Sequence, residues 1–246
     1  MKLQTIIAGL LLACGIGAQA SEQHAHWGYS GEHGAKQWGD MEPGFAECKL
    51  GKQQSPIDIR GAVKSELPSI GFDYKQSGAE VVNNGHTIQV NLAAGGSVML
   101  DSGEYKLLQF HFHTPSEERI KGKAYPMVAH LVHKNAEGML AVVAVLFKQG
   151  KENAALKPIF AALPTKEGAS MALEGGINPA DILPAKHNYY KFVGSLTTPP
   201  CSEGVRWQVL KQPVELSKAQ IAAFQKLYKM NARPVQPLNG RRIEEN

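Results

Sequence analysis

The chain has 246 residues, of which 43% are hydrophobic and 20% are charged. These proportions are typical of a globular protein and exclude a disordered chain, and the length suits one domain, because all-β domains of 200–250 residues are common. The formal net charge of +4 is small and spread along the sequence, so we expect no nucleic-acid partner and no membrane span in the body of the chain.

The first twenty residues have the three parts of a secretory signal peptide: a lysine at position 2, an apolar stretch, and an Ala-Gln-Ala cleavage pattern that ends at Ala20. We expect cleavage after Ala20, which leaves residues 21–246 as the mature domain and makes the protein periplasmic or secreted. The alternative is a lipoprotein signal, because residues 11–14 resemble a lipobox, although Cys14 lies early for one. Both interpretations predict export.

Two cysteines, Cys48 and Cys201, remain once the signal segment is removed. In an oxidising compartment an even pair of cysteines predicts a disulfide; the alternative is two free buried thiols. Cys201 directly follows the Thr-Thr-Pro-Pro run at 197–200. The bridge would therefore also hold that loop in place.

Short strand-like runs dominate the chain after an irregular N-terminal segment. Residues 22–60 are rich in glycine, tryptophan and polar residues with little periodicity, and we expect them to lie over the sheet with Trp27 and Trp38 as packing anchors. Residues 239–246 predict a frayed tail. Neither an internal repeat nor a linker divides the chain, so the prediction is a mainly β, single-domain fold. The predicted strands are 81–90, 97–101, 105–114, 127–135, 139–148, 189–193 and 205–211, and the predicted helices are 151–163 and 217–230.

The stretch 109–117 reads QFHFHTPSE and alternates two histidines with two phenylalanines. Because side chains alternate faces along a β-strand, His111 and His113 would share one face with Gln109, while the phenylalanines pack into a core behind them. A lone H-x-H pattern is weak, since a polar strand face can look the same.

A second apolar run, MVAHLVH at 127–133, adds a third histidine. Facing residues on adjacent strands have Cβ atoms about 5 Å apart, so His130 could complete a triangle with His111 and His113 that is small enough for one ion. Three protein ligands with an open fourth position are typical of catalytic zinc. His133 falls on the opposite face of the strand, which predicts a buried core histidine.

Six motifs together resemble the α-class carbonic anhydrases, and the secreted bacterial branch is the nearest match. They follow the family's order and span roughly residues 25 to 240, nearly the whole mature chain. The resemblance implies a large, mostly antiparallel, twisted central β-sheet of about ten strands with short peripheral helices. The motifs are HWGY at 26–29, QSPIDI at 54–59, NNGH at 83–86, QFHFHTPSE at 109–117, AHLVH at 129–133 and GSLTTPPC at 194–201.

The resemblance also implies an activity: reversible hydration of carbon dioxide to bicarbonate and a proton, by attack of a hydroxide bound to Zn²⁺. Thr197 and Glu117 would orient that hydroxide, and His86 would be the proton shuttle; from the residues alone these are an unremarkable turn threonine, surface glutamate and strand histidine. The same resemblance implies the Cys48–Cys201 pairing. The implied metal ligands are His111, His113 and His130; the implied apolar substrate wall is Val132, Val142, Leu196, Val205 and Trp207, with Thr198 and Gln109 on the polar side.

One departure from the family pattern concerns the third ligand. Zinc-ligating histidines almost always donate their other ring N–H to an acceptor, and the family supplies a glutamate where this chain has Val128. The family usually places a histidine where this chain has Glu118. We hypothesise that Glu118 moves into the vacated space and accepts from His130. The alternatives are a water in the gap, or Glu118 turned to solvent and a weakened ligand.

Two rival functions come from other classes. A non-enzymatic binding module on the same fold is disfavoured, because the three histidines, Thr197, Glu117 and His86 are all present. A catalytically weak or ester-hydrolysing zinc enzyme would differ only in its relative rates on carbon dioxide and ester. The sequence leaves open a monomer or a homodimer.

Overall fold

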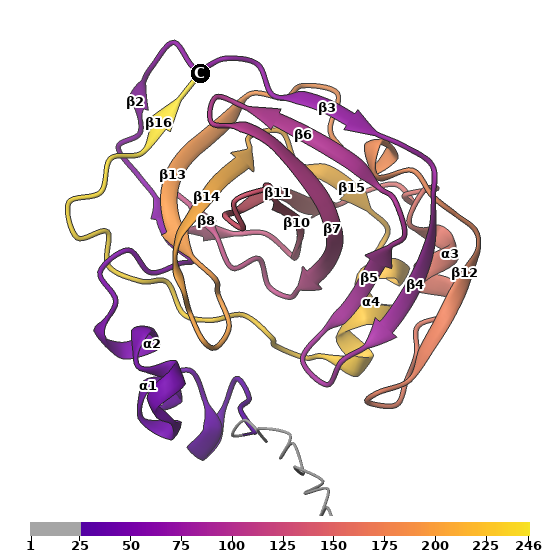
Figure 1. The fold of residues 1–246 in the computed structure, drawn as a ribbon. Coiled ribbons are helices and arrows are strands. Elements are labelled where there is room, and N and C mark those ends of the chain that lie inside the picture. Colours follow the sequence, from indigo (N-terminus) through magenta and orange to yellow (C-terminus); the bar gives the residue numbers. More distant parts are fainter. Residues whose placement is uncertain (1–25) are drawn as a thin grey trace, which may run out of the picture.

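One curved β-sheet organises residues 26–246, the part of the chain described by the computed structural model. The sheet has 13 strands, and ten of them form one continuous path (Figure 1). In path order these are β12 (Ser170–Ile177), β4 (Ser77–Asn83), β5 (Ile88–Leu92), β7 (Gly103–His113), β10 (Met127–Lys134), β11 (Leu140–Gln149), β14 (Glu203–Leu210), β13 (Tyr189–Ser195), β16 (Glu244–Glu245) and β2 (Val63–Lys64). The predicted signal segment, with Cys14 and Ala20, lies outside the described residues.

Three further strands pair beside this path. β6 (Gly96–Leu100) lies between β7 and β3 (Gly71–Tyr74), and β15 (Val214–Leu216) pairs with β11. Among the described strands of this sheet the pairings are antiparallel except β11–β14, β11–β15 and β16–β2. The expected large, twisted, mostly antiparallel sheet is therefore confirmed.

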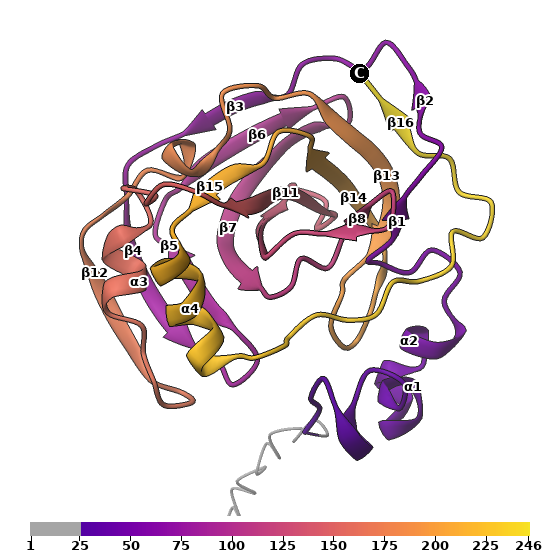
Figure 2. The same cartoon turned by 180° about the vertical axis from the view of Figure 1, so that it is seen from behind.

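The remaining elements are short and lie on the surface of the sheet. A small sheet joins β1 (Asp58–Ile59), β8 (Arg119–Ile120) and β9 (Lys123–Ala124). Seen from behind, α3 and α4 lie beside β12 and β4 (Figure 2). The helices are η1 (Gly31–His33), α1 (Trp38–Met41), η2 (Pro43–Phe45), α2 (Glu47–Leu50), α3 (Lys157–Ala161), η3 (Pro179–Ile182) and α4 (Lys218–Leu227).

The sheet separates two apolar cores. The larger core includes Phe110, Phe112 and Leu131, and α4 adds Phe224 to it. The smaller core lies on the other face and includes Val142 and Trp207. Because strand side chains alternate faces, His111, which lies between the two phenylalanines of β7, and His113 after them point toward the smaller core.

A β-bulge in β7 sets which face each side chain occupies. Val132 of β10 pairs with Gln109 and His133 pairs with Leu107, which leaves Leu108 without a partner across the ladder. The extra residue shifts the alternation by one. Leu107 before the bulge and Phe110 after it therefore both face the larger core, and Gln109 faces the opposite side.

Three local expectations were wrong. The predicted strand 81–90 is two strands, because residues 84–87 form a turn held by the Asn84 side chain. The predicted helix 151–163 is only α3, since Pro158 allows a helix to start but not to extend backward through it. The predicted frayed tail contains β16, which is held between β13 and β2 over the buried Ile243.

None of the helices between residues 26 and 246 combines the length and the apolar character needed to cross a bilayer.

Candidate metal centre

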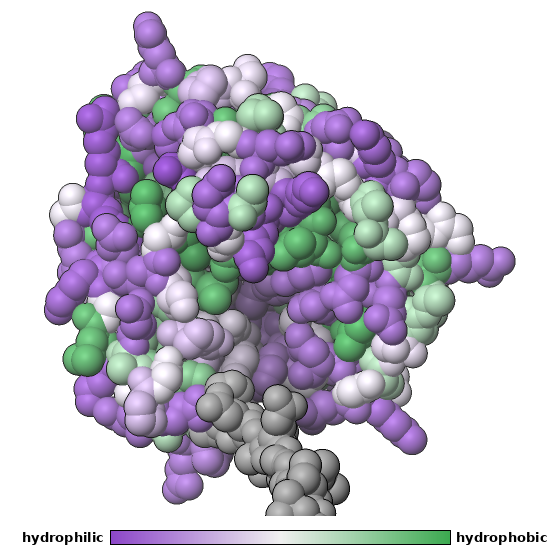
Figure 3. Space-filling view, viewed as in Figure 1, coloured by the Kyte–Doolittle hydropathy of each residue, from purple (hydrophilic) through white to green (hydrophobic). Residues whose placement is uncertain are grey.

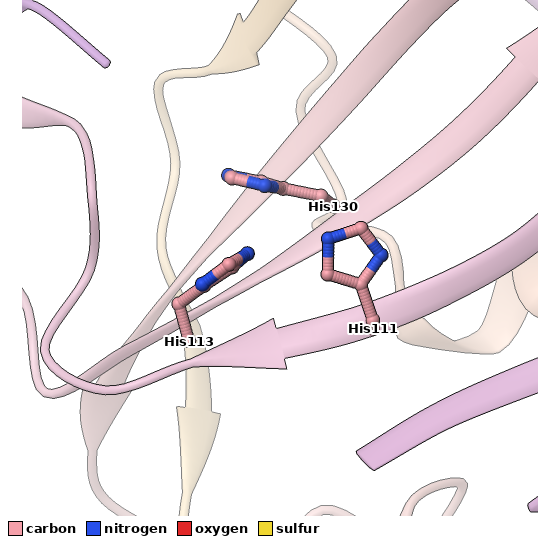
Figure 4. A group of neighbouring side chains, drawn as sticks. All are labelled: His111, His113 and His130. Carbon is pink, nitrogen blue, oxygen red and sulfur yellow. The ribbon is translucent and has the colours of Figure 1, made fainter. Parts of the chain in front are cut away.

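Three histidines from two adjacent strands meet on the smaller-core face. His111 and His130 are direct partners across the β7–β10 ladder, and His113 lies two residues further along β7. Each offers a ring nitrogen, and the three nitrogens lie within 4.8 Å of one another. Figure 4 shows the three rings turned toward a common point. This triangle is the one expected from the spacing of the two strands.

The other nitrogen of each ring is engaged by a protein acceptor. His111 Nδ1 lies 2.9 Å from Oε1 of Gln109, and His113 Nδ1 lies 2.7 Å from the carbonyl oxygen of Asn231. His130 Nε2 lies 2.9 Å from Oε1 of Glu118. The facing Nε2 of His113 is buried and has no hydrogen-bond partner within residues 26–246. Outer acceptors of this kind fix histidine ligands for a metal, so the described residues fit a zinc ion held by three neutral imidazoles.

Glu118 provides the hydrogen-bond acceptor for His130 that Val128 cannot provide. Both side chains are fully buried, and the carboxylate of Glu118 reaches His130 from the loop between β7 and β8. The loop is braced by Ser116, whose hydroxyl donates to the Glu118 carbonyl at 2.7 Å. The hypothesised hydrogen bond is therefore present, and Glu118 is not turned to solvent.

Glu117, the preceding residue of the same loop, also lies against the histidines. Its Oε2 is 3.5 Å from Nε2 of His113 and 3.8 Å from Nδ1 of His130, and its Oε1 accepts from the backbone N–H of Arg233 at 2.7 Å. Burial raises the pKa of Glu117 to about 7, against the opposing effects of His130 and of the Thr197 side chain. Thr197 and Glu117, distant in sequence, are thus neighbours.

The three histidines differ in proton affinity. Burial, followed by the nearby charge of His130, lowers the pKa of His111 to about 3 and the pKa of His113 well below its usual range. Burial also acts to lower the pKa of His130, but the carboxylates of Glu118 and Glu117 outweigh it and raise the pKa. Neutral imidazoles at His111 and His113 are the form that binds a metal.

The predicted apolar wall is one contiguous cluster next to the histidines. The Trp207 ring packs edge-on against His130, with the ring centroids 4.9 Å apart at 82°, and its Nε1 donates to the carbonyl of Ser195 at 3.1 Å. Thr198 is half-buried beside Thr197. The members in the smaller core are Val142, Val205 and Trp207, with Val132 and Leu196 packed against them.

His86 lies in the turn between β4 and β5, outside the described cluster of His111, His113 and His130. Its ring stacks on Trp27, with centroids 3.6 Å apart and planes 6° apart. Burial, followed by the neighbouring His26, lowers the pKa of His86 from its usual value. The His86 ring is half-buried, so part of it remains accessible to solvent.

Cys48 and Cys201 form a disulfide, with their Cα atoms 5.0 Å apart. The bridge ties α2 to the residue that follows the Thr-Thr-Pro-Pro loop, as expected. The Gln54 side chain donates to the Cys201 carbonyl at 3.0 Å, and the Arg233 guanidinium donates to the Cys48 carbonyl at 2.9 Å. The loop that carries Thr197 is therefore held from two sides.

Sequence reasoning missed Asn231 and Arg233, which lie in an irregular segment after α4. The Asn231 carbonyl orients His113, and the Arg233 N–H orients Glu117. These two contacts use backbone atoms of Asn231 and Arg233, and the segment has no periodicity that could have indicated a site. Trp27 was expected to be a packing anchor, but its stacking on the His86 ring was not predicted.

One groove between described residues lies apart from the candidate residues. The face seen in Figure 3 is hollowed near its centre, with hydrophilic and hydrophobic residues around the hollow. A separate groove of about 630 Å³ lies between residues 151–155, 181–185 and 212–215, and none of the candidate residues lines it.

Comparison with known proteins identifies close relatives. A family model described as eukaryotic-type carbonic anhydrase matches residues 33–246. A carbonic anhydrase from Pectobacterium carotovorum is 42% identical over 244 residues, covering 99% of each chain, and one from Neisseria gonorrhoeae is 44% identical, covering 99% of this chain and 97% of the relative. The α-carbonic anhydrase of Thermovibrio ammonificans, solved with the inhibitor sulfanilamide, has a TM-score of 0.88 at 48% identity, covering 89% of this chain and 99% of that one.

Proposed function

Because the chain belongs to the eukaryotic-type carbonic anhydrase family, we propose that it catalyses the reversible hydration of carbon dioxide to bicarbonate and a proton. The observation that carries the proposal is the histidine triangle, in which each ring has one nitrogen bound to a protein acceptor and one turned inward. Such a set, beside an apolar wall and a buried carboxylate, suits a catalytic metal better than a structural one.

The cofactor is proposed to be zinc, held by His111, His113 and His130. When bound, zinc supplies a Lewis acid that makes water nucleophilic at neutral pH, for which carbonic anhydrases are the usual example. Gln109 and Glu118 would keep the rings in place by accepting from their outer nitrogens. The negative charge of Glu118 would also strengthen His130 as a donor.

Thr197 and Glu117 would orient the attacking group. An ionised carboxylate can only accept hydrogen bonds, whereas a threonine hydroxyl has one proton to donate. If Thr197 donates to Glu117, the threonine oxygen must accept from whatever stands between it and the histidines. The pair would therefore select a nucleophile that carries a proton and aim its free lone pair at the carbon of CO₂. A divalent cation among the histidines would favour the ionised form of Glu117.

The apolar cluster around Trp207 would receive carbon dioxide. CO₂ has no net dipole and donates no hydrogen bond, so a dry wall holds it without competing with water for polar partners. Val142, Val205 and Trp207 are almost fully buried, and Leu196 places the wall next to Thr197. Thr198 and Gln109 would line the opposite, polar side.

His86 would export the proton that each hydration releases. Its half-buried position in the turn between β4 and β5 suits a group that takes a proton from inside and passes it to buffer. Stacking on Trp27 would hold the ring when it faces outward.

Export to the periplasm or beyond is proposed from the signal-like residues 1–20 and agrees with the Cys48–Cys201 disulfide. Mass spectrometry of the purified protein tests both points: the mature chain should begin at Ser21 and carry no alkylatable thiol before reduction. A lipid on Cys14, or two free thiols in the native protein, would contradict the proposal.

The function is tested by metal analysis together with a CO₂-hydration assay on the mature protein. We expect one zinc per chain, loss of hydration on chelation, recovery when zinc is returned, and far slower hydrolysis of an activated ester. A protein that holds one zinc per chain but does not hydrate CO₂ would contradict the assignment and favour a binding role.

A further inference from the structure

Asn231 connects two parts of the proposed site through its side chain as well as its backbone. Its carbonyl accepts from His113, and its Oδ1 accepts from the backbone N–H of Thr114 at 2.8 Å. Its amide group donates twice, to the carbonyl of Phe112 at 2.9 Å and to the carbonyl of His86 at 3.1 Å. The residue is fully buried; its bond to the Phe112 carbonyl is also buried, and its bond to the His86 carbonyl is partly buried.

The two carbonyls bridged by that amide group belong to different elements. Phe112 lies between the ligands His111 and His113 on β7, whereas His86 lies in the β4–β5 turn. The turn has internal order of its own, because Asn84 Oδ1 accepts from the backbone of His86 and of the next residue. Those bonds shape the turn but do not place it relative to β7, the strand that carries His111 and His113.

The β5–β7 ladder, in which Gln89 pairs with His111, places the strand after the turn beside the metal ligands, and side-chain contacts place the turn itself. The Thr87 hydroxyl donates to the Phe112 carbonyl at 2.5 Å, which anchors the end of the turn at β5. The Asn231 amide anchors the carbonyl of His86 itself. The ring of His86 is then free to stack on Trp27 from a fixed backbone.

We infer that Asn231 is a positioning residue for proton export: its amide group fixes the turn that carries His86 to the strand that carries the metal ligands. The role rests on the proposed function, in which His86 relays protons. One carboxamide would thus hold the backbone of the relay residue against β7, beside the β5–β7 ladder, while its own carbonyl orients a ligand. Proton relay and metal geometry would be coupled through a single residue after α4.

The direct test replaces the side chain and leaves the backbone carbonyl in place. Asn231→Ala removes both amide donors, and Gln220→Ala is the matched control, because Gln220 is a buried carboxamide with three hydrogen bonds to backbone atoms away from the histidines. Hydrogen exchange of the peptide covering residues 83–88, followed by mass spectrometry, reports how firmly the turn is held. We expect exchange there to rise about fivefold in Asn231→Ala, as for the loss of one typical hydrogen bond, and to stay unchanged in Gln220→Ala.

Kinetics on the same zinc-loaded variants separate positioning from general damage. In weak buffer, where proton export limits turnover, Asn231→Ala should lower kcat about fivefold, while kcat/KM falls by less than about twofold. Added imidazole should restore most of kcat. The double variant Asn231→Ala/His86→Ala should turn over no more slowly than His86→Ala alone. Should the alanine variant fail to fold, Asn231→Ser is measured in the same way.

Each outcome bears on the inference. Unchanged exchange at residues 83–88 overturns it, whatever the kinetics. Faster exchange with unchanged kcat, in a protein whose turnover does depend on His86, also overturns it. If His86→Ala is as fast as the wild type, the proposed relay fails by itself, and exchange alone then decides whether Asn231 anchors the turn.

Discussion

Two buried histidines, His130 and His133, lie three residues apart on β10, and their pKa values are shifted in opposite directions. His130 faces the smaller core, where Glu118 accepts from it at 2.9 Å and two further histidines stand opposite. His133 faces the larger core, where its Nε2 lies 2.7 Å from the hydroxyl of Tyr74. Both are almost fully inaccessible, so burial does not distinguish them.

Their partners make the difference. Carboxylates beside His130 raise its pKa, whereas burial lowers the pKa of His133 to about 4 despite hydrogen bonds to backbone carbonyls. Both ring nitrogens of His133 have protein partners, the Tyr74 hydroxyl and the Ala141 carbonyl, whereas His130 keeps one nitrogen turned toward the other two clustered histidines. The ligand histidine and the core histidine therefore differ in whether one ring nitrogen is left facing the cluster.

The largest expected effect is the loss of His130. His130→Ala removes one of three ligands, and we expect zinc affinity to fall by well over the roughly 100-fold that losing an outer partner can cost. CO₂ hydration should be nearly abolished. Zinc content after dialysis measures the change, and His133→Gln on the same strand is the control that should keep its zinc. Full zinc content in His130→Ala would remove this residue from the site.

The next effect tests the acceptor behind His130. Glu118→Gln keeps the shape of the side chain but removes its charge, so zinc should be lost to a chelator roughly 10–100-fold faster. Val128→Glu, which adds a second buried carboxylate beside the first, should help little. Unchanged zinc loss in Glu118→Gln, with tighter binding in Val128→Glu, would show that Glu118 is not the partner that matters.

The pH dependence of folding should distinguish the second histidine. His133 has a pKa of about 4 in the folded protein and 6.5 as its ordinary value, so the unfolded chain binds the extra proton between these limits. The folding stability that depends on neutral His133 is fully present above about pH 6.5 and is lost as the pH falls toward 4. We expect a loss of about 2 kcal/mol between pH 7 and pH 5. Denaturant unfolding at both pH values measures it, and His133→Gln should show a correspondingly smaller change.

The smallest expected effect concerns Tyr74, the uncharged hydrogen-bond partner of His133. Tyr74→Phe removes the hydroxyl from His133 and should cost about 1 kcal/mol of unfolding free energy, with no change in zinc content or CO₂ hydration. Denaturant unfolding and the two site assays check this. A variant that lost zinc would mean that the two faces of β10 are not independent.

Much of the site was predictable because it depends on the period of a strand. Alternation in 109–117 placed His111 and His113 on one face, and the same rule put His130 and His133 on opposite faces. The mainly β fold, the family and the pairing of Cys48 with Cys201 were likewise predictable from the residues and the order of their motifs. All of these are properties of neighbours along the chain or of motifs taken in order.

The tertiary structure decided which distant atoms meet. Glu118 reaches His130 from a loop, the carbonyl of Asn231 reaches His113 across 118 positions, and the N–H of Arg233 reaches Glu117 across 116. The tail strand β16 and the bulge at Leu108 also depend on partners far away in sequence. Local periodicity carries no record of such contacts, because the energy that fixes them comes from satisfying buried donors and acceptors once the whole sheet has closed around them.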